Sequence, residues 1–234
     1  MGLSNSEAGG KAMQLLFIRH GQATGNQAGR MMGHGQDGLS DLGLQQVQAL
    51  GRRLMAESYH PTAIYSSPLE RAKQTAIALA GMVDPSPQPI LYRDALCEFQ
   101  NGIFQGLTWV EAQQRYPDLC RDLEASLAWQ PIPGAETLQS GRDRAAQFMQ
   151  EILHHHSEGD RLCIVTHHWI LQQLISVVLG SDRTWGFAAD YTARFEFHVA
   201  TEFWSRRDQN RWNSDLWKIV RFGDRQHLTD VDPR

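Results

Sequence analysis

Two short apolar runs constrain the fold of this chain more than any other feature of its 234 residues. The first, Leu15 to Ile18, leads directly into Arg19 and His20, and the second lies in residues 161–166 and is followed by His167. Short continuous apolar runs are typical of strands that are covered on both faces. They are far too short to span a bilayer. The sequence therefore indicates an α/β fold whose buried strands end in polar residues.

Segments with helical spacing alternate with these strands. Ser40 and the Ser67-Pro68-Leu69-Glu70 stretch, which has the capping-box spacing and a proline at the first helical position, predict two helix starts, the second with Arg71 in its first turn. Further helices are expected around residues 145–153 and 170–178, the latter ending at Gly180, and further strands at residues 63–65, 195–203 and 216–220. This alternation predicts a three-layer α/β/α fold with a mainly parallel sheet.

Composition sets the domain organisation and the class of partner. No repeat or linker divides the chain, so we expect a flexible tail over residues 1–12 and a single domain over residues 13–234. The first six residues also fit a loose myristoylation pattern, but a short small-residue tail explains them better. A net charge of −4 argues against nucleic acid or an anionic membrane as the partner. Three cysteines without a C-x-x-C pair and no signal-like start predict a cytoplasmic protein.

The polar residues at the strand ends predict an anion site. In open α/β sheets, ligands bind beyond the carboxyl ends of the strands. Arg19, His20 and His167 would lie at that edge, together with a helix N-terminus that carries Arg71. Each residue alone has an ordinary structural explanation, and only their coincidence at one edge favours function.

A series of motifs in the same order then resembles one known family, the histidine phosphatase superfamily, whose relatives include the cofactor-dependent phosphoglycerate mutases. The resemblance spans roughly residues 15–228. It rests on residues 17–26 (FIRHGQATGN), 38–43 (GLSDLG), 66–76 (SSPLERAKQTA), 96–98 (LCE) with Gly102 and 106–108 (GLT), 133–137 (PGAET), 164–167 (IVTH) and 226–228 (QHL).

The resemblance implies a role for each matching residue. His20 would be the nucleophile that carries the phosphoryl group and must be neutral when it attacks. Arg19, Arg71 and His167 would clamp the phosphoryl charge, with Asn26 as a neutral donor. Glu98 would protonate the leaving oxygen and then activate water, so we expect partly apolar surroundings to keep it protonated near neutral pH. No metal and no cofactor is implied.

Three features do not fit this pattern directly. His168 stands where the family usually has glycine, and we expect it to pack away from the phosphate rather than crowd it, because consecutive strand-end residues face opposite ways. Gln22 replaces a common glutamate, which should be harmless or mildly helpful. The glycine-rich residues 33–38 are most simply explained as a mobile loop, and the histidines at 154–156 as a solvated helix end rather than a metal site.

The resemblance leaves a choice of activity. The stretch from Glu98 to Pro133 is short, which favours a phosphatase over a mutase, and its many aromatic residues but few cations, Arg115 and Arg121, favour a small phosphomonoester with an apolar or sugar-like remainder. We therefore expect a metal-independent phosphoric monoester hydrolase acting on a small phosphorylated metabolite. The alternatives are mutase-type phosphoryl transfer and a catalytically silent phospho-ligand binding module. Tryptophans and arginines alternate over residues 204–217, a pattern that can bind single-stranded nucleic acid but is better explained here by packed strand residues beside a solvated turn. A homodimer is also compatible with the sequence.

Overall fold

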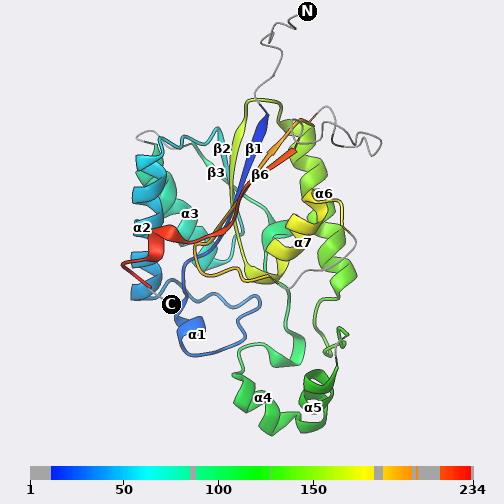
Figure 1. Ribbon diagram of the computed structural model, residues 1–234. Helices are drawn as coiled ribbons and strands as arrows, with labels where there is room; N and C mark the ends of the chain where they lie inside the picture. Colours follow the sequence, from blue (N-terminus) through cyan, green and yellow to red (C-terminus); the bar gives the residue numbers. More distant parts are fainter. Residues whose placement is uncertain are drawn as a thin grey trace, which may run out of the picture.

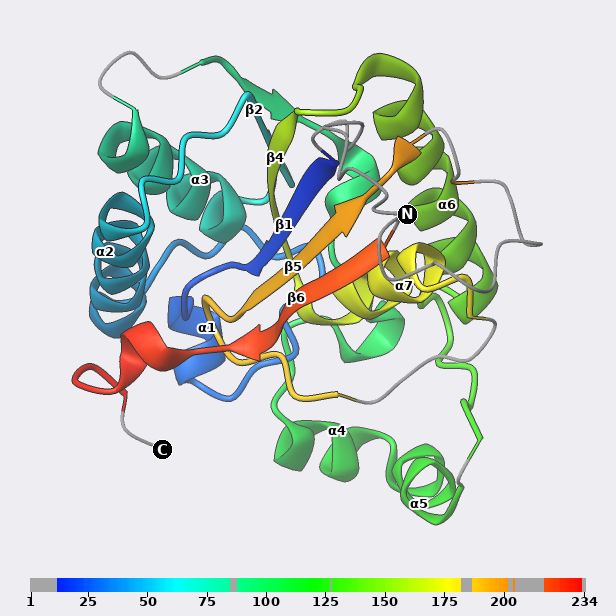
Figure 2. The same cartoon turned by 45° about the horizontal axis from the view of Figure 1, so that its top comes forward.

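The computed structural model describes residues 12–84, 88–126, 128–181, 187–201, 204 and 217–232. These residues contain one six-stranded sheet in which a parallel part is extended by two antiparallel strands (Figures 1 and 2). In spatial order the strands are β3 (Ile90–Tyr92), β2 (Ala63–Ser66), β4 (Arg161–Thr166), β1 (Met13–Arg19), β5 (Arg194–Val199) and β6 (Trp217–Asp224). The prediction of a mainly parallel sheet is confirmed for β3, β2, β4 and β1.

Helices cover both faces of this sheet. Figure 2 shows α2 (Asp41–Ala56) and α3 (Glu70–Val83) on one face, and α6 (Leu138–His155) and α7 (His168–Val178) on the other. Alternate residues of β1 divide between two apolar clusters, because Leu15 and Phe17 pack with α6 and α7 whereas Leu16 and Ile18 pack with α2 and α3. The three-layer α/β/α prediction is therefore confirmed.

Three short helices lie beyond the carboxyl edge of the sheet. They are α1 (Thr24–Gln27), α4 (Trp109–Arg115) and α5 (Pro117–Ala125), and Figure 1 shows all three on the same side of the molecule. The helices α4 and α5 have a small apolar cluster of their own, which includes Phe104 and Cys120. The stretch that carries them, between Glu98 and Pro133, therefore projects from the main core at the edge where the strands end.

The two predicted helix starts have different outcomes. Ser40 caps α2 as expected, since its Oγ accepts a 3.1 Å hydrogen bond from the Gly43 amide. The prediction that Ser67 caps α3 is wrong: the helix begins at Glu70 with Leu69 at the N-cap position. The chain is still extended at Leu69, so the Ser67 hydroxyl accepts from the Leu69 amide and closes the turn that precedes the helix.

Two glycines let β1 approach α2 closely. A Cβ on Gly21 would lie 2.8 Å from the Gly43 carbonyl oxygen, and a Cβ on Gly43 would lie 2.0 Å from the Gln22 carbonyl oxygen. Neither position has room for a side chain. This contact fixes the direction in which the chain leaves β1, and with it the place of His20.

Some predictions fall outside the described residues. The tail over residues 1–12 lies there apart from residue 12, as does most of the Trp- and Arg-rich segment over residues 204–217. Within the described part of the chain, no helix is both long and apolar enough to cross a membrane.

Candidate active site

A cavity of about 560 Å³ opens at the carboxyl edge of the sheet. Five of the six predicted site residues line it, from separate elements: Arg19 and His20 at the end of β1, Asn26 in α1, Arg71 in the first turn of α3 and Glu98 before α4. The sixth, His167, is fully buried, and its ring centroid lies 4.9 Å from that of His20. The structure therefore brings together every residue that the sequence placed at this site. We call Arg19, His20, Arg71 and His167 the phosphate floor.

His20 is held in one tautomer. Its Nδ1 lies 2.6 Å from the Gly21 carbonyl oxygen, which can only accept, so Nδ1 carries the proton. The Arg71 Nε–H donates to His20 Nε2 over 3.2 Å, which requires a lone pair on Nε2. Both contacts agree on an unprotonated Nε2, the atom that a nucleophilic histidine uses.

Burial also keeps both floor histidines neutral. Desolvation lowers the pKa of His20 well below 6.5, and the charges of Arg71 and Arg19 lower it further. The pKa of His167 is lowered in the same way by burial first and then by Arg71. His20 thus meets the requirement for a neutral nucleophile near pH 7. His167 is a neutral hydrogen-bonding group in the free site, not a cation.

The loop over residues 33–38 holds Arg71 in place. The Arg71 Nη1 donates to the Gly35 carbonyl and its Nη2 to the Gly33 carbonyl, each over 2.8 Å. His34, between them, bonds through Nε2 to the Glu98 carbonyl over 2.8 Å. The expectation of a mobile glycine-rich loop is therefore wrong, because this loop is tied to two of the site residues.

Arg19 and Asn26 are each held by a hydrogen bond to the backbone. The Arg19 Nη1 donates to the Ala189 carbonyl over 2.6 Å, and its guanidinium lies 4.0 Å from the centre of the Tyr191 ring. The Asn26 Oδ1 accepts from the Ala23 amide over 3.2 Å, which leaves its amide hydrogens as the donors on the cavity side. Both side chains are thereby oriented as donors toward the cavity.

Glu98 caps the N-terminus of α7. Its carboxylate accepts from the Trp169 amide at 3.1 and 3.2 Å and from the Ile170 amide at 3.3 Å, and also from its own neighbour Phe99 at 2.9 Å. Two of these N–H groups, those of Trp169 and Ile170, lie at the N-terminus of α7, and the third belongs to Phe99. The surroundings are therefore more polar than the sequence led us to expect, and they suit the base role of Glu98 directly.

His168 lines the cavity, so the expectation that it packs away is wrong. The argument from strand alternation fails because His167 is the N-cap of α7 and His168 is already helical. Its Nε2 lies 3.3 Å from Gln172 Nε2, one turn along the helix. Burial lowers the pKa of His168, with Arg19 adding to the effect and Glu98 opposing it.

Four aromatic side chains line another part of the cavity, together with methionines and polar groups. We call these four the aromatic wall: Phe99, Phe104, Trp109 and Trp129, all from the stretch between Glu98 and Pro133. Trp129 lies 6.2 Å from Phe99 and 5.5 Å from Trp169 of α7, measured between ring centroids. Neither Arg115 nor Arg121 lines the cavity. The expected scarcity of cations on this side is confirmed for the described residues, where Arg30 is the wall's cation and is paired with Glu111.

Sequence reasoning missed four residues that contact the site: His34, Ser67, Trp169 and Tyr191. Ser67 Oγ lies 2.8 Å from His167 Nε2, and Tyr191 stacks beside both Arg19 and His20. Ser67 and His34 lie inside motifs that the sequence offered, and only their contacts reveal a role. Tyr191 lies in an irregular segment with no pattern to mark it.

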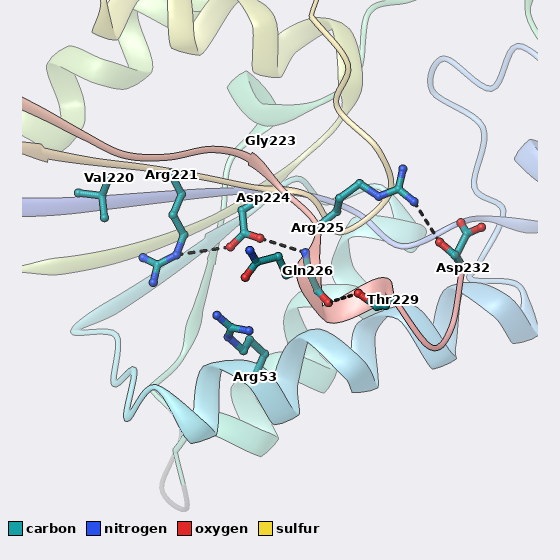
Figure 3. Close-up of a pocket in the computed structure, with 9 residues that line it drawn as sticks. All are labelled: Arg53, Val220, Arg221, Gly223, Asp224, Arg225, Gln226, Thr229 and Asp232. Atoms are coloured by element: carbon teal, nitrogen blue, oxygen red, sulfur yellow. Dashed lines mark hydrogen bonds and ion pairs between the residues drawn. The ribbon is translucent and has the colours of Figure 1, made fainter. Parts of the chain in front are cut away.

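A second, larger hollow lies elsewhere, between α2 and the end of β6 (Figure 3). Its arginines already face carboxylates: Arg53 pairs with Glu57 at 2.5 Å, and Arg221 lies 3.4 Å from Asp224. The third arginine, Arg225, pairs with Asp190 at 2.7 Å, so among the described residues each arginine of this hollow already has a carboxylate partner. Among the described residues, no group of three or more histidine, cysteine, aspartate or glutamate side chains is arranged to hold a metal ion.

Comparison with known proteins agrees with this geometry. The profile of the histidine phosphatase superfamily (branch 1) matches residues 15–214. A metal-independent phosphoserine phosphatase from Arabidopsis thaliana is 35% identical over 219 residues, which cover 93% of this chain and 84% of the relative. The chain belongs to the histidine phosphatase superfamily, and it is a phosphatase that hydrolyses phosphate monoesters.

Solved structures support the same fold. Bacillus stearothermophilus YhfR superposes with a TM-score of 0.74 at 26% identity, covering 93% of this chain and all of that one (100%). A phosphoserine phosphatase mutant from Entamoeba histolytica, solved in complex with phosphoserine, superposes with a TM-score of 0.68 at 21% identity, covering 92% and 99% of the two chains. The expected phosphoglycerate mutase-like architecture is confirmed.

Proposed function

We propose that this protein hydrolyses a small phosphomonoester without a metal ion, through a phosphohistidine on His20, and that phosphoserine is the first substrate to test. The observation that carries the proposal is the state of His20, whose Nε2 lone pair faces the Arg71 Nε–H while Nδ1–H is bonded to Gly21. A ring held in this way attacks phosphorus without first losing a proton. Phosphoserine is suggested by the Arabidopsis relative.

The first step transfers the phosphoryl group to His20. The Arg71 Nε–H turns from His20 Nε2 to a phosphoryl oxygen, and the freed Nε2 lone pair attacks phosphorus in line while Arg19 and Arg71 stabilise the charge on the phosphoryl oxygens. Glu98 gives a proton to the departing alkoxide.

The second step releases phosphate. Glu98 is then a carboxylate, the form that its amide partners stabilise, and it removes a proton from the water that attacks the phosphohistidine. His20 leaves with its Nε2 lone pair restored. The same residue thus serves as acid and then as base.

The cavity supports a substrate with a single phosphate. Its polar floor occupies one end, and the aromatic wall has Arg30 as its cation, already paired with Glu111. A second phosphate would therefore meet aromatic rings rather than a free charge. A cytoplasmic location, a homodimer and the absence of nucleic-acid or membrane partners stay predictions from the sequence.

The test is phosphate release from phosphoserine in the presence of a chelator, compared with release from a sugar bisphosphate. We expect His20→Ala to lower kcat/KM by at least ~10³-fold, because the residual rate no longer passes through a covalent intermediate. His155→Ala is the matched control, since His155 is exposed and lies outside the cavity. When the reaction with phosphate-labelled phosphoserine is stopped with base, the wild type should carry a phosphoryl label that is stable in base and lost in acid. His20→Ala should carry none. Equal rates for the two enzymes, or activity that the chelator abolishes, would contradict the proposal.

A further inference from the structure

Ser67 links His167 to a buried cysteine directly behind the phosphate floor. Its Oγ lies 2.8 Å from His167 Nε2 and 3.7 Å from Cys97 Sγ, and it also accepts from the Leu69 amide over 3.2 Å. Ser67 and His167 are fully buried and Cys97 nearly so. No solvent therefore competes for these contacts, and the protons must be shared among the protein atoms themselves.

The hydroxyl of Ser67 has one proton and two acceptors to choose from. The Oγ–Sγ distance of 3.7 Å also allows a hydrogen bond from Ser67 to Cys97, but an imidazole nitrogen is a strong acceptor and a thiol sulfur a weak one, and the contact with His167 Nε2 is much shorter at 2.8 Å. The opposite arrangement, with Nε2–H donating to Ser67, would direct the hydroxyl proton to the weak acceptor on Cys97. The geometry therefore favours a Ser67 hydroxyl that donates to His167 Nε2.

This direction determines the other nitrogen of His167. A neutral imidazole whose Nε2 accepts carries its proton on Nδ1. The Nδ1 of His167 is buried and has no hydrogen-bond partner among the described residues. Buried N–H groups without a partner are rare and destabilising, and they persist where a ligand completes them. The ring centroid lies 4.9 Å from that of His20, so a phosphoryl group carried by His20 would arrive beside the His167 ring.

We propose that Ser67 is a positioning residue that fixes His167 as the Nδ1–H tautomer, so that a proton and not a lone pair faces the phosphoryl oxygen. The inference rests on the proposed function, because it assigns the partner of Nδ1 to the phosphoryl group carried by His20. Both floor histidines are then Nδ1–H tautomers, but they direct different ring nitrogens toward the phosphoryl group. His20 donates from Nδ1 to Gly21 and keeps a lone pair on Nε2, which accepts from Arg71 until it attacks phosphorus, whereas His167 accepts at Nε2 and presents Nδ1–H.

The tautomer can be measured by two-bond ¹H–¹⁵N NMR on the full-length enzyme with ¹⁵N-labelled histidine at pH 7.5. We expect the Nδ1–H pattern for His167 in the wild type and its loss in Ser67→Ala. Cys97→Ala is the matched control: it removes the competing acceptor and keeps the Ser67–His167 bond, so the pattern should stay. An Nε2–H pattern in the wild type, or an Nδ1–H pattern that survives in Ser67→Ala, would overturn the inference.

Phosphate binding and kinetics give a second readout. Titration with inorganic phosphate should shift the His167 Nδ1–H proton resonance in the wild type, and a resonance that does not move at saturating phosphate would overturn the inference. Ser67→Ala should lower kcat by roughly 10- to 100-fold, as expected when one preorganised donor is misdirected, and Ser67→Thr should recover most of the rate. These results separate the two proposals: an inactive wild type that still shows Nδ1–H contradicts the function, whereas an active wild type with Nε2–H contradicts only the role of Ser67.

Discussion

The phosphate floor and the aromatic wall share one cavity but are stabilised by different forces. Each floor side chain is fixed by a hydrogen bond to a backbone or buried group, such as Gly21 for His20 and Gly33 for Arg71. The wall is held by ring contacts, and Trp129 keeps 41% of its surface exposed. Hydrogen bonds define position to a fraction of an ångström, whereas apolar contacts tolerate exchange of side chains of similar volume.

This difference assigns the two halves of the reaction to two parts of the molecule. The floor must match the charge of a phosphoryl group in its transition state, a task that needs preorganised donors. The wall must accommodate the remainder of the substrate, which depends on shape and apolar area. We therefore expect changes in the floor to lower kcat and changes in the wall to raise KM.

The largest effect in this comparison is expected for Arg71→Lys. The lysine keeps the charge but loses the fork that donates to His20, Gly33 and Gly35. We expect kcat to fall about 10²-fold with a smaller change in KM, measured by steady-state phosphate release. Arg115→Lys, on the exposed side of α4, is the matched control and should leave both constants unchanged. If Arg71→Lys raised KM and left kcat unchanged, the expected difference between floor and wall would be contradicted.

A smaller effect, on KM rather than on kcat, is expected for Trp129→Ala. Trp129 lines the cavity, and the apolar area that its ring offers to the substrate is worth on the order of 0.5–1.5 kcal/mol, so KM should rise roughly 2- to 10-fold while kcat stays within about 2-fold. Val110→Ala in the same stretch of chain is the control, since Val110 is exposed and does not line the cavity. Should kcat fall as much as it does in Arg71→Lys, the wall would take part in the chemistry itself.

The same comparison explains what the sequence could predict. The floor was predictable because parallel strands end at one edge, so His20 and His167 meet wherever β1 and β4 pair. Arg71 followed from its place in the first turn of α3, although the helix begins later than its capping pattern indicated. Local periodicity was sufficient for these residues, because their positions depend on single elements.

The wall and the fine contacts of the site were not predictable from periodicity. Trp129 reaches the cavity only because the stretch between Glu98 and Pro133 folds back through contacts between distant residues, such as that with Trp169. His168 was placed wrongly because one residue decides where β4 ends and α7 begins. The hydrogen bonds of Ser67 and His34 depend on side-chain directions that no spacing rule specifies.

The smallest expected effect concerns His227, a partly buried histidine next to the floor. His227 supports the floor through Thr192, whose Oγ1 lies 2.9 Å from His227 Nε2 and whose amide donates to the Arg19 carbonyl over 3.0 Å. Burial, with the charge of Arg194, lowers the pKa of His227 from 6.5 to about 4. The unfolded chain therefore binds more protons than the folded one between these values, and the stabilisation is present above pH 6.5 and lost as the pH falls toward 4.

This linkage predicts a pH dependence that the wall does not share. Between pH 7 and pH 6, a histidine that stays neutral only when folded loses up to about 0.7 kcal/mol of stabilisation, an upper value for a partly exposed ring. The difference in unfolding free energy between the two pH values, measured by urea titration, should shrink by that amount in His227→Gln and not in the exposed control His155→Gln. In α4, the hydrogen bond from the Thr108 amide and then the contact with Arg30 lower the pKa of Glu111 below 4.5, so their contribution is lost only in a more acidic range. If the difference in unfolding free energy between pH 7 and pH 6 is the same in His227→Gln as in the wild type, His227 takes up its proton as readily in the folded protein as in the unfolded chain, and the predicted pH dependence is contradicted.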